Sequence, residues 1–246
     1  MTRHDLLVII PAYNEEANVA GVIQGIQTHL PGADVLVIND GSRDRTAQVA
    51  SGAGAEVLTL PYNMGYGAAL QTGYKYGREN GYQILAQIDA DGQHDPVYIP
   101  AMLNLIRRGE ADIVIGSRFL VRSEYRAPLA KRVGMLLFGT IASWATGQRI
   151  SDPTSGYQAL NRRAFCYCAA DVYPSDFADA DVIIMLHRAG LRIREVAVKM
   201  YPSGNKQSRY LNMYSFLTPA YYIFKMSLAV FVCLLRARGG AEKVLD

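Results

Sequence analysis

The chain has 246 residues, 50% of them hydrophobic, which is enough for one sizeable α/β domain and too little for two. Its formal net charge is only +3, and it has no dense lysine and arginine run and no nucleic-acid-binding motif, so we expect no nucleic-acid partner. The three cysteines form no CxxC pair and no even-numbered framework, which favours a reduced cytosolic environment. The apolar run at the amino terminus is too short for a signal peptide, so we expect no export.

The first part of the chain alternates short apolar runs with helical patterns. Residues 5–10, 35–38 and 57–60 predict three strands, and each is followed by a polar loop and a helix. Ser42 or Asp44 can cap the second of these helices. Because strands alternate with helices, the sequence predicts a parallel sheet wound by right-handed crossovers.

A fourth strand, predicted at 82–88, leads directly into the motif DADGQ. Asp89 and Asp91 should therefore lie at the carboxyl end of a strand, where open α/β sheets bind their ligands. If the chain stays extended there, Asp89, Asp91 and Gln93 point the same way and offer oxygen atoms to one point. A ligand set made of oxygen alone selects Mg²⁺ or Mn²⁺ over zinc. The motif predicts a metal site for a diphosphate, with an ordinary Asp-Gly-Pro turn as the alternative.

The alternation continues for one more unit and then stops. We expect a helix at 96–108 and a fifth strand at 112–116, which ends in the motif GSR. Mostly apolar or amphipathic helices are expected at 128–148 and 177–189. Residues 191–198 alternate polar and apolar side chains, which predicts an antiparallel strand.

The carboxyl-terminal part differs in character from the rest. Residues 216–235 are mostly apolar and long enough to span a bilayer, but Lys225 lies near their middle. We therefore expect a catalytic domain at 1–210, followed at 211–246 by an amphipathic helix and tail that lie on a membrane or dock on the domain. A single membrane span and an ordinary core helix are the alternatives.

Four strand ends carry the motifs PAYNE, NDGS, DAD and GSR in that order. Together they resemble the family 2 glycosyltransferases of the GT-A fold, and the later DPTSGY motif is similar to that of the polyprenyl-phosphate sugar synthases, such as dolichyl-phosphate mannose synthase. The resemblance covers roughly residues 6–236. It implies an α/β fold with a mainly parallel sheet flanked by helices, and a membrane-associated helical segment at the carboxyl terminus.

The resemblance also implies a nucleotide pocket at these strand ends. Asp40 would hydrogen-bond the base or ribose, since a carboxylate can accept bonds from base N–H groups. The alternatives are a turn role for Asp40 and a helix-dipole role for Glu15. Tyr66, Gly92 and Asp95 depart from the common family pattern, which leaves a GDP-sugar and a UDP-sugar both open as donor. The implied nucleotide-binding residues are Pro11, Ala12, Tyr13, Glu15, Asp40, Asn63, Asp89 and Ala90, and the implied metal ligands are Asp89, Asp91 and Gln93.

The implied reaction is an inverting, metal-dependent transfer of a sugar from a nucleotide-sugar to a polyprenyl phosphate. A phosphate monoester has a second pKa near ~6 and is already a nucleophile at neutral pH, so it calls for cations and not for a general base. Arg118 follows a strand end and can bind phosphate bidentately, so we predict that it acts in catalysis with Asp91 and Asp152. Further contacts to the acceptor phosphate are expected from basic residues, for which a solvated rim is the alternative: Arg126, Lys131, Lys206 and Arg209.

Two rival functions stay open at this point. One is a glycosyltransferase with a glycan hydroxyl as acceptor and Asp179 or Asp181 as base, and the other is a silent nucleotide-sugar-binding subunit. A polyprenyl acceptor keeps its tail in lipid, so we expect a peripheral protein on the cytoplasmic face of the cell membrane. Residues 133–144 and the carboxyl-terminal helix would supply the membrane contact.

Overall fold

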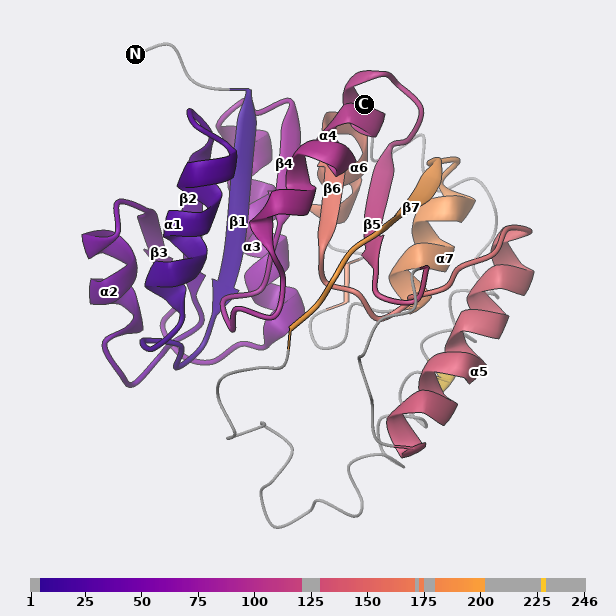
Figure 1. Ribbon diagram of the computed structural model, residues 1–246, viewed down its shortest axis with the longest axis horizontal. Helices are drawn as coiled ribbons and strands as arrows, with labels where there is room; N and C mark the ends of the chain where they lie inside the picture. The colour runs from indigo at the N-terminus through magenta and orange to yellow at the C-terminus, as the bar shows by residue number, and fades with distance from the viewer. Residues whose placement is uncertain (1–4, 121–128, 171–172, 175–179, 202–226, 229–246) are drawn as a thin grey trace.

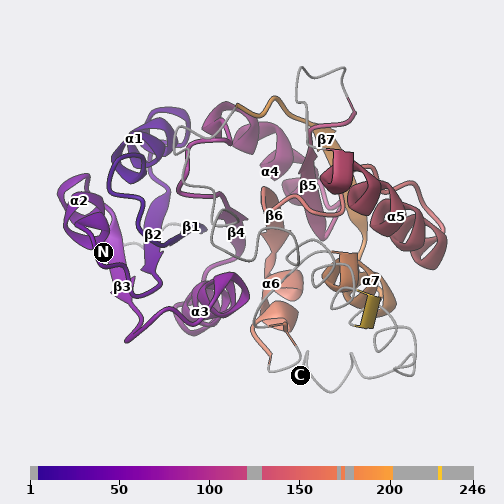
Figure 2. The same ribbon diagram turned by 90° about the horizontal axis from the view of Figure 1, so that it is seen from below.

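The computed structural model describes residues 5–120, 129–170, 173–174, 180–201 and 227–228. In this part of the chain one seven-stranded sheet lies between two layers of helices (Figures 1 and 2). The strands are β1 (Leu6–Ala12), β2 (Asp34–Asn39), β3 (Glu56–Thr59), β4 (Ile84–Gln87), β5 (Ile113–Ser117), β6 (Gln158–Asn161) and β7 (Ile193–Ala197). The helices are α1 (Val19–His29), α2 (Thr46–Gly52), α3 (Tyr66–Glu79), the 3₁₀ turn η1 (Pro96–Tyr98), α4 (Ile99–Arg107), α5 (Leu129–Thr146), α6 (Arg162–Cys168) and α7 (Ala180–Arg188).

Strand β1 shows why the sheet is covered on both faces. All seven of its residues are buried. Val8 and Ile10 pack in the core formed with α1, α2 and α4, whereas Leu7 and Ile9 pack in the core formed with α3, α5, α6 and α7. A strand buried on both sides reads as a continuous apolar run, which is the pattern expected of a parallel sheet.

The strand order is β3-β2-β1-β4-β6-β5-β7. Strands β1 to β4 pair in parallel, and so do β5 and β7, whereas β6 runs antiparallel to both β4 and β5. The mainly parallel sheet that the sequence predicts is therefore confirmed. Because the parallel strands share one direction, their carboxyl ends and the amino end of β6 meet at a single edge of the sheet.

The expectation that 191–198 pairs antiparallel was wrong. Strand β7 lies parallel to β5, with Ile193 opposite Ile113. Its alternating polarity has another cause, since β7 is an edge strand whose side chains after Ile193 are partly or fully exposed. The antiparallel member is β6, a strand of four residues that the sequence analysis did not predict. Three of its residues are buried in succession, so it shows no alternation.

Several expectations concern residues outside the described part. These include the predicted domain boundary at 210 and most of the apolar stretch 216–235. Nor are residues 175–179 described, and helix α7 is described from Ala180 onward. A search of the described helices finds none with both the length and the apolar character that a bilayer crossing requires.

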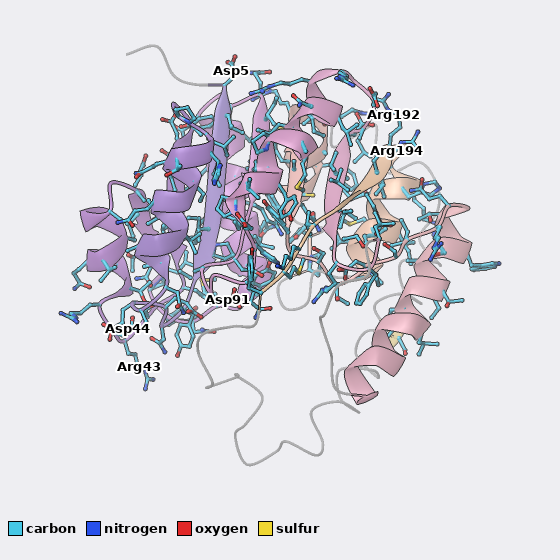
Figure 3. The ribbon with its side chains drawn as sticks, in the orientation of Figure 1. Asp5, Arg43, Asp44, Asp91, Arg192 and Arg194 are labelled. Atoms are coloured by element: carbon cyan, nitrogen blue, oxygen red, sulfur yellow. The ribbon has the colours of Figure 1, made fainter. Side chains whose placement is uncertain are left out.

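Asp112 joins three strands at the edge of the sheet opposite the motifs, near the Arg192 labelled in Figure 3. It precedes β5, and its Oδ2 accepts hydrogen bonds from the backbone N–H (2.7 Å) and the Nε (3.0 Å) of Arg192, just before β7. Its Oδ1 accepts a bond of 2.7 Å from Nδ2 of Asn161, at the end of β6. Burial acts to raise the pKa of Asp112, but the hydrogen bonds from Arg192 and Asn161 outweigh it and hold the pKa below its usual value.

We predict that Asp112→Asn lowers the free energy of unfolding at pH 7 by about 1–2 kcal/mol, because it weakens charge-assisted hydrogen bonds. The folded-state pKa of Asp112 is depressed, so its contribution is present above about pH 4 and is lost as the pH falls through that lower pKa. Urea unfolding at several pH values should therefore show the variant and the wild type converging below about pH 4.

Glu110→Gln is the matched control, because Glu110 pairs with Arg108 at 3.8 Å with both side chains at least half exposed. It should shift stability by less than about 1 kcal/mol. A constant difference between Asp112→Asn and wild type at all pH values would contradict the assigned role of the charge.

Candidate active site

The motif-bearing loops meet at the carboxyl edge of the sheet. Asp91 lies at the lower edge in Figure 3, whereas Asp5, at the start of β1, lies at the opposite edge. This lower edge carries the loops that follow β1, β2, β3 and β4, because these four strands are parallel and end there. The DPTSGY segment reaches the same edge because the antiparallel strand β6 begins there. The strand ends of an open α/β sheet are the usual place for a ligand.

The loops after β1 and β2 are cross-linked by hydrogen bonds. Asn14, which has the left-handed φ of 55°, donates its N–H to Oγ of Ser42 (2.9 Å) and accepts a bond from the N–H of Arg43 (2.8 Å). The N–H of Glu15 donates to Oγ1 of Thr46 at 2.8 Å. Glu15 is buried, and its carboxylate accepts a bond from Asn18. The PAYNE and NDGS motifs therefore form one rigid unit.

The predicted nucleotide-binding residues fall on this unit and around it. Pro11 and Ala12 are the buried last residues of β1, and Tyr13 is half-buried just beyond them. Asn63 is exposed in the loop before α3, and Ala90 is buried between the two aspartates of DAD. Their contact with a nucleotide stays a prediction.

Asp40 ties the end of β2 to the loop that precedes α3. Its two carboxylate oxygens accept hydrogen bonds from the N–H groups of Met64 (2.7 Å) and Gly65 (3.1 Å). The neighbouring Gly41 has φ of +65°, and a Cβ at this position would lie 2.5 Å from the carbonyl carbon of Tyr62. Only glycine fits so close an approach. Asp40 thus orders a loop beside the predicted nucleotide pocket, and a direct bond to the base or ribose stays a prediction.

The DAD motif is turned and not extended. Residues 90–91 form a turn, and Gly92 has φ of +76°. Oδ1 and Oδ2 of Asp91 accept hydrogen bonds from the backbone N–H (3.0 Å) and Nε2 (2.8 Å) of Gln93. The assumption that these side chains alternate along an extended chain was therefore wrong, because glycine after Asp91 allows the chain to turn back on it. Metal ligation by Asp89, Asp91 and Gln93 stays a prediction.

The electrostatics of the DAD turn fit a divalent cation. Burial, and next the charge of Asp89, raise the pKa of Asp91, so the two carboxylates repel each other. A cation between them would relieve this repulsion. Within the described residues no group of three or more His, Cys, Asp or Glu side chains could hold a metal by itself. Asp89 and Asp91 do offer carboxylate oxygens, and Mg²⁺ commonly binds proteins through one or two carboxylates together with substrate phosphates and water.

Arg118 and Asp152 form a buried ion pair beside this site. Nε and Nη2 of Arg118 donate to Oδ2 (2.6 Å) and Oδ1 (3.0 Å) of Asp152, and the residues are only 6% and 0% exposed. Nη2 also donates to Oγ1 of Thr154 at 3.1 Å. The structure thus brings together two residues that we predicted to be catalytic. The bidentate side of the guanidinium binds a carboxylate, however, where we had expected the acceptor phosphate to bind.

Glu195 is a site residue that the sequence analysis missed. It lies on the edge strand β7, and its carboxylate accepts hydrogen bonds from the N–H groups of Ser151 (2.9 and 3.0 Å) and Asp152 (3.0 Å) and from Oγ of Ser151 (2.9 Å). Glu195 therefore fixes the backbone from which Asp152 reaches Arg118. Nothing in the sequence distinguishes it from the other polar residues of an edge strand.

His94 and Tyr157 join the DAD turn to the DPTSGY segment. Their rings stack with centroids 4.9 Å apart and an interplanar angle of 12°. The hydroxyl of Tyr157 donates to the carbonyl of Asp95 at 2.7 Å. Nδ1 of His94 lies 3.7 Å from Oδ2 of Asp89. The stacked pair packs against the predicted metal ligand Asp89, a contact that the sequence analysis did not predict.

The remaining predicted residues are only partly described. Arg126, Lys206, Arg209 and Asp179 lie outside the described part, and Lys131 is in the first turn of α5 with its side chain not described. Asp181 is the second residue of α7 and is buried. Contacts of these residues with an acceptor stay predictions.

Comparison with known proteins identifies the family. The model of glycosyl transferase family 2 matches residues 7–167, which include the strands β1 to β6 and every motif described above. The chain belongs to glycosyl transferase family 2. The resemblance inferred from the motifs is confirmed, and the protein is a glycosyltransferase with a GT-A-type sheet.

The relatives of this glycosyltransferase include polyprenyl-phosphate enzymes. The undecaprenyl-phosphate mannosyltransferase of Micrococcus luteus is 34% identical over 209 residues, which cover 78% of this chain and 82% of that protein. The UDP-N-acetylglucosamine--dolichyl-phosphate N-acetylglucosaminyltransferase of Methanococcus voltae is 28% identical over 227 residues, covering 85% and 90%. Glucosyl-3-phosphoglycerate synthase from Mycobacterium tuberculosis, solved with Mn²⁺, UDP and glucosyl-3-phosphoglycerate, has a TM-score of 0.64 at 22% identity, covering 94% and 78%. This last likeness shows the fold alone.

We predict that Asp152→Ala lowers the free energy of unfolding by about 3–5 kcal/mol, because it leaves the buried Arg118 guanidinium without its carboxylate. Chemical denaturation measures the loss. Glu79→Ala is the control, since its pair with Arg78 is 3.8 Å long and exposed, and it should cost at most about 1 kcal/mol. Equal losses in the two variants would contradict the assignment of Arg118 and Asp152 as a buried pair.

Proposed function

We propose that this glycosyltransferase moves a hexose from a nucleotide-sugar to a polyprenyl phosphate, with inversion at the anomeric carbon. The observation that carries the proposal is the packing of the DPTSGY segment directly on the DAD turn, through the stacked rings of His94 and Tyr157. The motif that resembles that of the polyprenyl-phosphate sugar synthases therefore lies beside the proposed metal site. The names of the two relatives above, one a mannosyltransferase and one an N-acetylglucosaminyltransferase, support this class of acceptor.

The donor would bind at the unit formed by the loops after β1 and β2. Asp40 holds the neighbouring loop with two hydrogen bonds to backbone N–H groups, and each of its oxygens keeps a second lone pair that can accept from a base or ribose. Pro11, Ala12 and Tyr13 would form the adjacent wall. We propose GDP or UDP as the nucleotide.

Asp89 and Asp91 would hold a Mg²⁺ or Mn²⁺ ion, with Gln93 as a third contact. When bound, the ion supplies positive charge that stabilises the departing nucleoside diphosphate. The residues of the chain set up this position, because the Gln93 amide holds Asp91 and the DAD turn lies at the end of β4. The M. tuberculosis synthase of similar fold was solved with Mn²⁺ and UDP, which supports the choice of ion.

The acceptor phosphate would act as the nucleophile itself. One of its oxygens forms a bond to the anomeric carbon while the bond from that carbon to the diphosphate oxygen breaks, and the electron pair leaves with the nucleoside diphosphate. A single displacement of this kind inverts the configuration. It needs no general base, because the second pKa of a phosphate monoester is near ~6. Basic residues would hold the acceptor phosphate, for which our candidates are Arg126, Lys131, Lys206 and Arg209.

The pair of Arg118 and Asp152 would act as a rigid support for this acceptor side. Its bidentate geometry and burial fix the loop 151–154 next to the sheet edge. A hydroxyl acceptor is less favoured, because Asp181, one of the two candidate bases, is buried in helix α7. The presence of both DAD carboxylates argues against a silent binding subunit.

Because the proposed acceptor is a lipid, the protein would act at a membrane surface, which we propose to be the cytoplasmic face of the cell membrane. Helix α5 presents Trp144 and Leu137 to solvent, with exposed fractions of 77% and 44%. Exposed tryptophan is typical of a side chain that lies at the headgroup level. Peripheral attachment through α5 and the segment 211–246 is the arrangement we propose.

We predict that the protein releases UDP or GDP from a matching nucleotide-sugar when polyprenyl phosphate and Mn²⁺ or Mg²⁺ are supplied. Asp91→Asn should lower this rate by at least about 100-fold, the usual loss when a group that stabilises developing charge is removed. Asp5→Asn, which changes an exposed aspartate at the opposite edge of the sheet, is the matched control and should keep full activity. An unchanged rate in Asp91→Asn, or in excess chelator, would refute metal-dependent transfer.

We also predict a pH dependence set by the acceptor. The value of kcat/KM for polyprenyl phosphate should fall below about pH 6, as the dianion takes up a proton. A phosphonate acceptor, which is more basic, should move this falling limb to higher pH, and steady-state kinetics with both acceptors measures the shift. The same midpoint for both acceptors would mean that a protein group and not the acceptor controls the rate.

A further inference from the structure

Tyr66 holds one of the two DAD carboxylates. It is the first residue of helix α3, and its hydroxyl donates a hydrogen bond of 2.9 Å to Oδ1 of Asp89. Across the described residues it is the one hydrogen-bond donor to that carboxylate. The other oxygen of Asp89 lies 3.7 Å from Nδ1 of His94, and that nitrogen accepts a bond from the N–H of Asp89.

Two further contacts fix the position of Tyr66, one at its hydroxyl and one at the backbone that precedes it. A Cβ on Gly156 would lie 2.2 Å from the Tyr66 oxygen, so the hydroxyl fits directly against the backbone of the DPTSGY segment. On the other side, the residues just before Tyr66 are tied down by Asp40, whose carboxylate accepts bonds from the N–H groups of Met64 and Gly65. One side chain therefore contacts the DAD turn and the DPTSGY segment, and its backbone continues the loop beside the nucleotide pocket.

This contact matters because Asp89 and Asp91 repel each other when no cation lies between them. A carboxylate without a partner would turn away from its neighbour, and a cation would have to bring it back at a cost in binding free energy. A phenol is a neutral donor at ordinary pH, so it orients Asp89 and leaves its negative charge in place. Oδ1 keeps a second lone pair, and Oδ2 accepts no hydrogen bond from the described residues.

We infer that Tyr66 is a positioning residue that holds Asp89 beside Asp91 for a divalent cation and links this carboxylate to the nucleotide loop. The inference rests on the proposed metal-dependent transfer. It explains why an aromatic residue with a hydroxyl occupies the start of α3, at the point where three motif-bearing segments meet. Groups that orient a metal ligand typically change metal affinity by about 10- to 100-fold when they are removed.

The chain offers a matched control on the same helix. The hydroxyl of Tyr76 donates a hydrogen bond of 2.7 Å to the Glu56 carboxylate at the start of β3. Tyr66→Phe and Tyr76→Phe thus each remove one hydroxyl bonded to one carboxylate. Only Tyr66 lies beside the proposed metal site, so the comparison separates metal positioning from the general loss of a hydrogen bond.

The experiment is a titration of Mn²⁺, followed by electron paramagnetic resonance, with the full chain in the presence of UDP or GDP. We expect Tyr66→Phe to raise the Kd for Mn²⁺ by at least about 10-fold and Tyr76→Phe to leave it unchanged. In steady-state kinetics, Tyr66→Phe should raise the Mn²⁺ concentration needed for half activity while saturating Mn²⁺ restores most of kcat. A residue with a merely structural role would not show this rescue by metal.

Three outcomes overturn the inference, and they differ in what they mean for the proposed function. If Tyr66→Phe binds Mn²⁺ as tightly as wild type, the inference fails and the proposed function stands. If wild type itself binds no Mn²⁺ with either nucleotide, the metal-dependent mechanism fails together with the inference. Loss of kcat in Tyr66→Phe that excess Mn²⁺ does not restore would assign Tyr66 a structural role and overturn the inference as well.

Discussion

The site depends on keeping two carboxylates, Asp89 and Asp91, side by side at the end of a buried strand. This arrangement is unfavourable by itself, because burial and like charge both disfavour ionisation of Asp91. The surrounding groups act against this tendency. Gln93 holds Asp91 through two hydrogen bonds, one from its backbone N–H and one from its side-chain amide, and Tyr66 holds Asp89 through one. A divalent cation between the two carboxylates would relieve this repulsion, which is the role that we propose for it.

The mainly parallel sheet is what makes so dense a polar edge possible. Its central strand β1 is buried on both faces, so the cores on either side of it fix the positions from which the loops start. Every parallel strand then ends at the same edge. The antiparallel strand β6 adds a second contribution, because it starts at this edge and brings the DPTSGY segment between the ends of β4 and β5. One reversed strand thus places the DPTSGY motif against the DAD motif.

The first four strands could be predicted because each contains a short run rich in apolar and β-branched residues that is followed by polar residues, a pattern that can be read from the local sequence. The position of Asp89 and Asp91 at a strand end followed from the same reasoning. The direction of β7 could not be predicted. The alternation of polar and apolar residues in β7 results from its exposure at the edge of the sheet and does not depend on whether its neighbour is parallel or antiparallel. Contacts between residues far apart in the chain determine which strands pair. A strand of four residues such as β6 is too short for its sequence pattern to show that it is a strand or which strands it pairs with.

The site residues divide in the same way. Those in motifs could be named as candidates from the sequence, but the contacts of Glu195 and Tyr66 could not be predicted, because each bonds a residue distant in sequence. Glu195 bonds the backbone at 151–152, and Tyr66 bonds Asp89. The extended geometry expected for DADGQ failed for a local reason, the positive φ of Gly92. Glycine allows both extended and left-handed backbone, so its presence alone did not decide between them.

The ion pair of Arg118 and Asp152 limits how the acceptor phosphate can be held. The two charges cancel, and Nε and Nη2 of the guanidinium are bonded to the carboxylate at 2.6 and 3.0 Å. A dianionic acceptor therefore gains little net attraction from this pair, and the cations that attract it must come from elsewhere. The described chain stops at Leu120 beyond β5 and at Tyr201 beyond β7, and both strands point toward the site edge. Our candidates for these cations include Arg126, Lys206 and Arg209, which follow these two points in the sequence, and their contact with an acceptor phosphate stays a prediction.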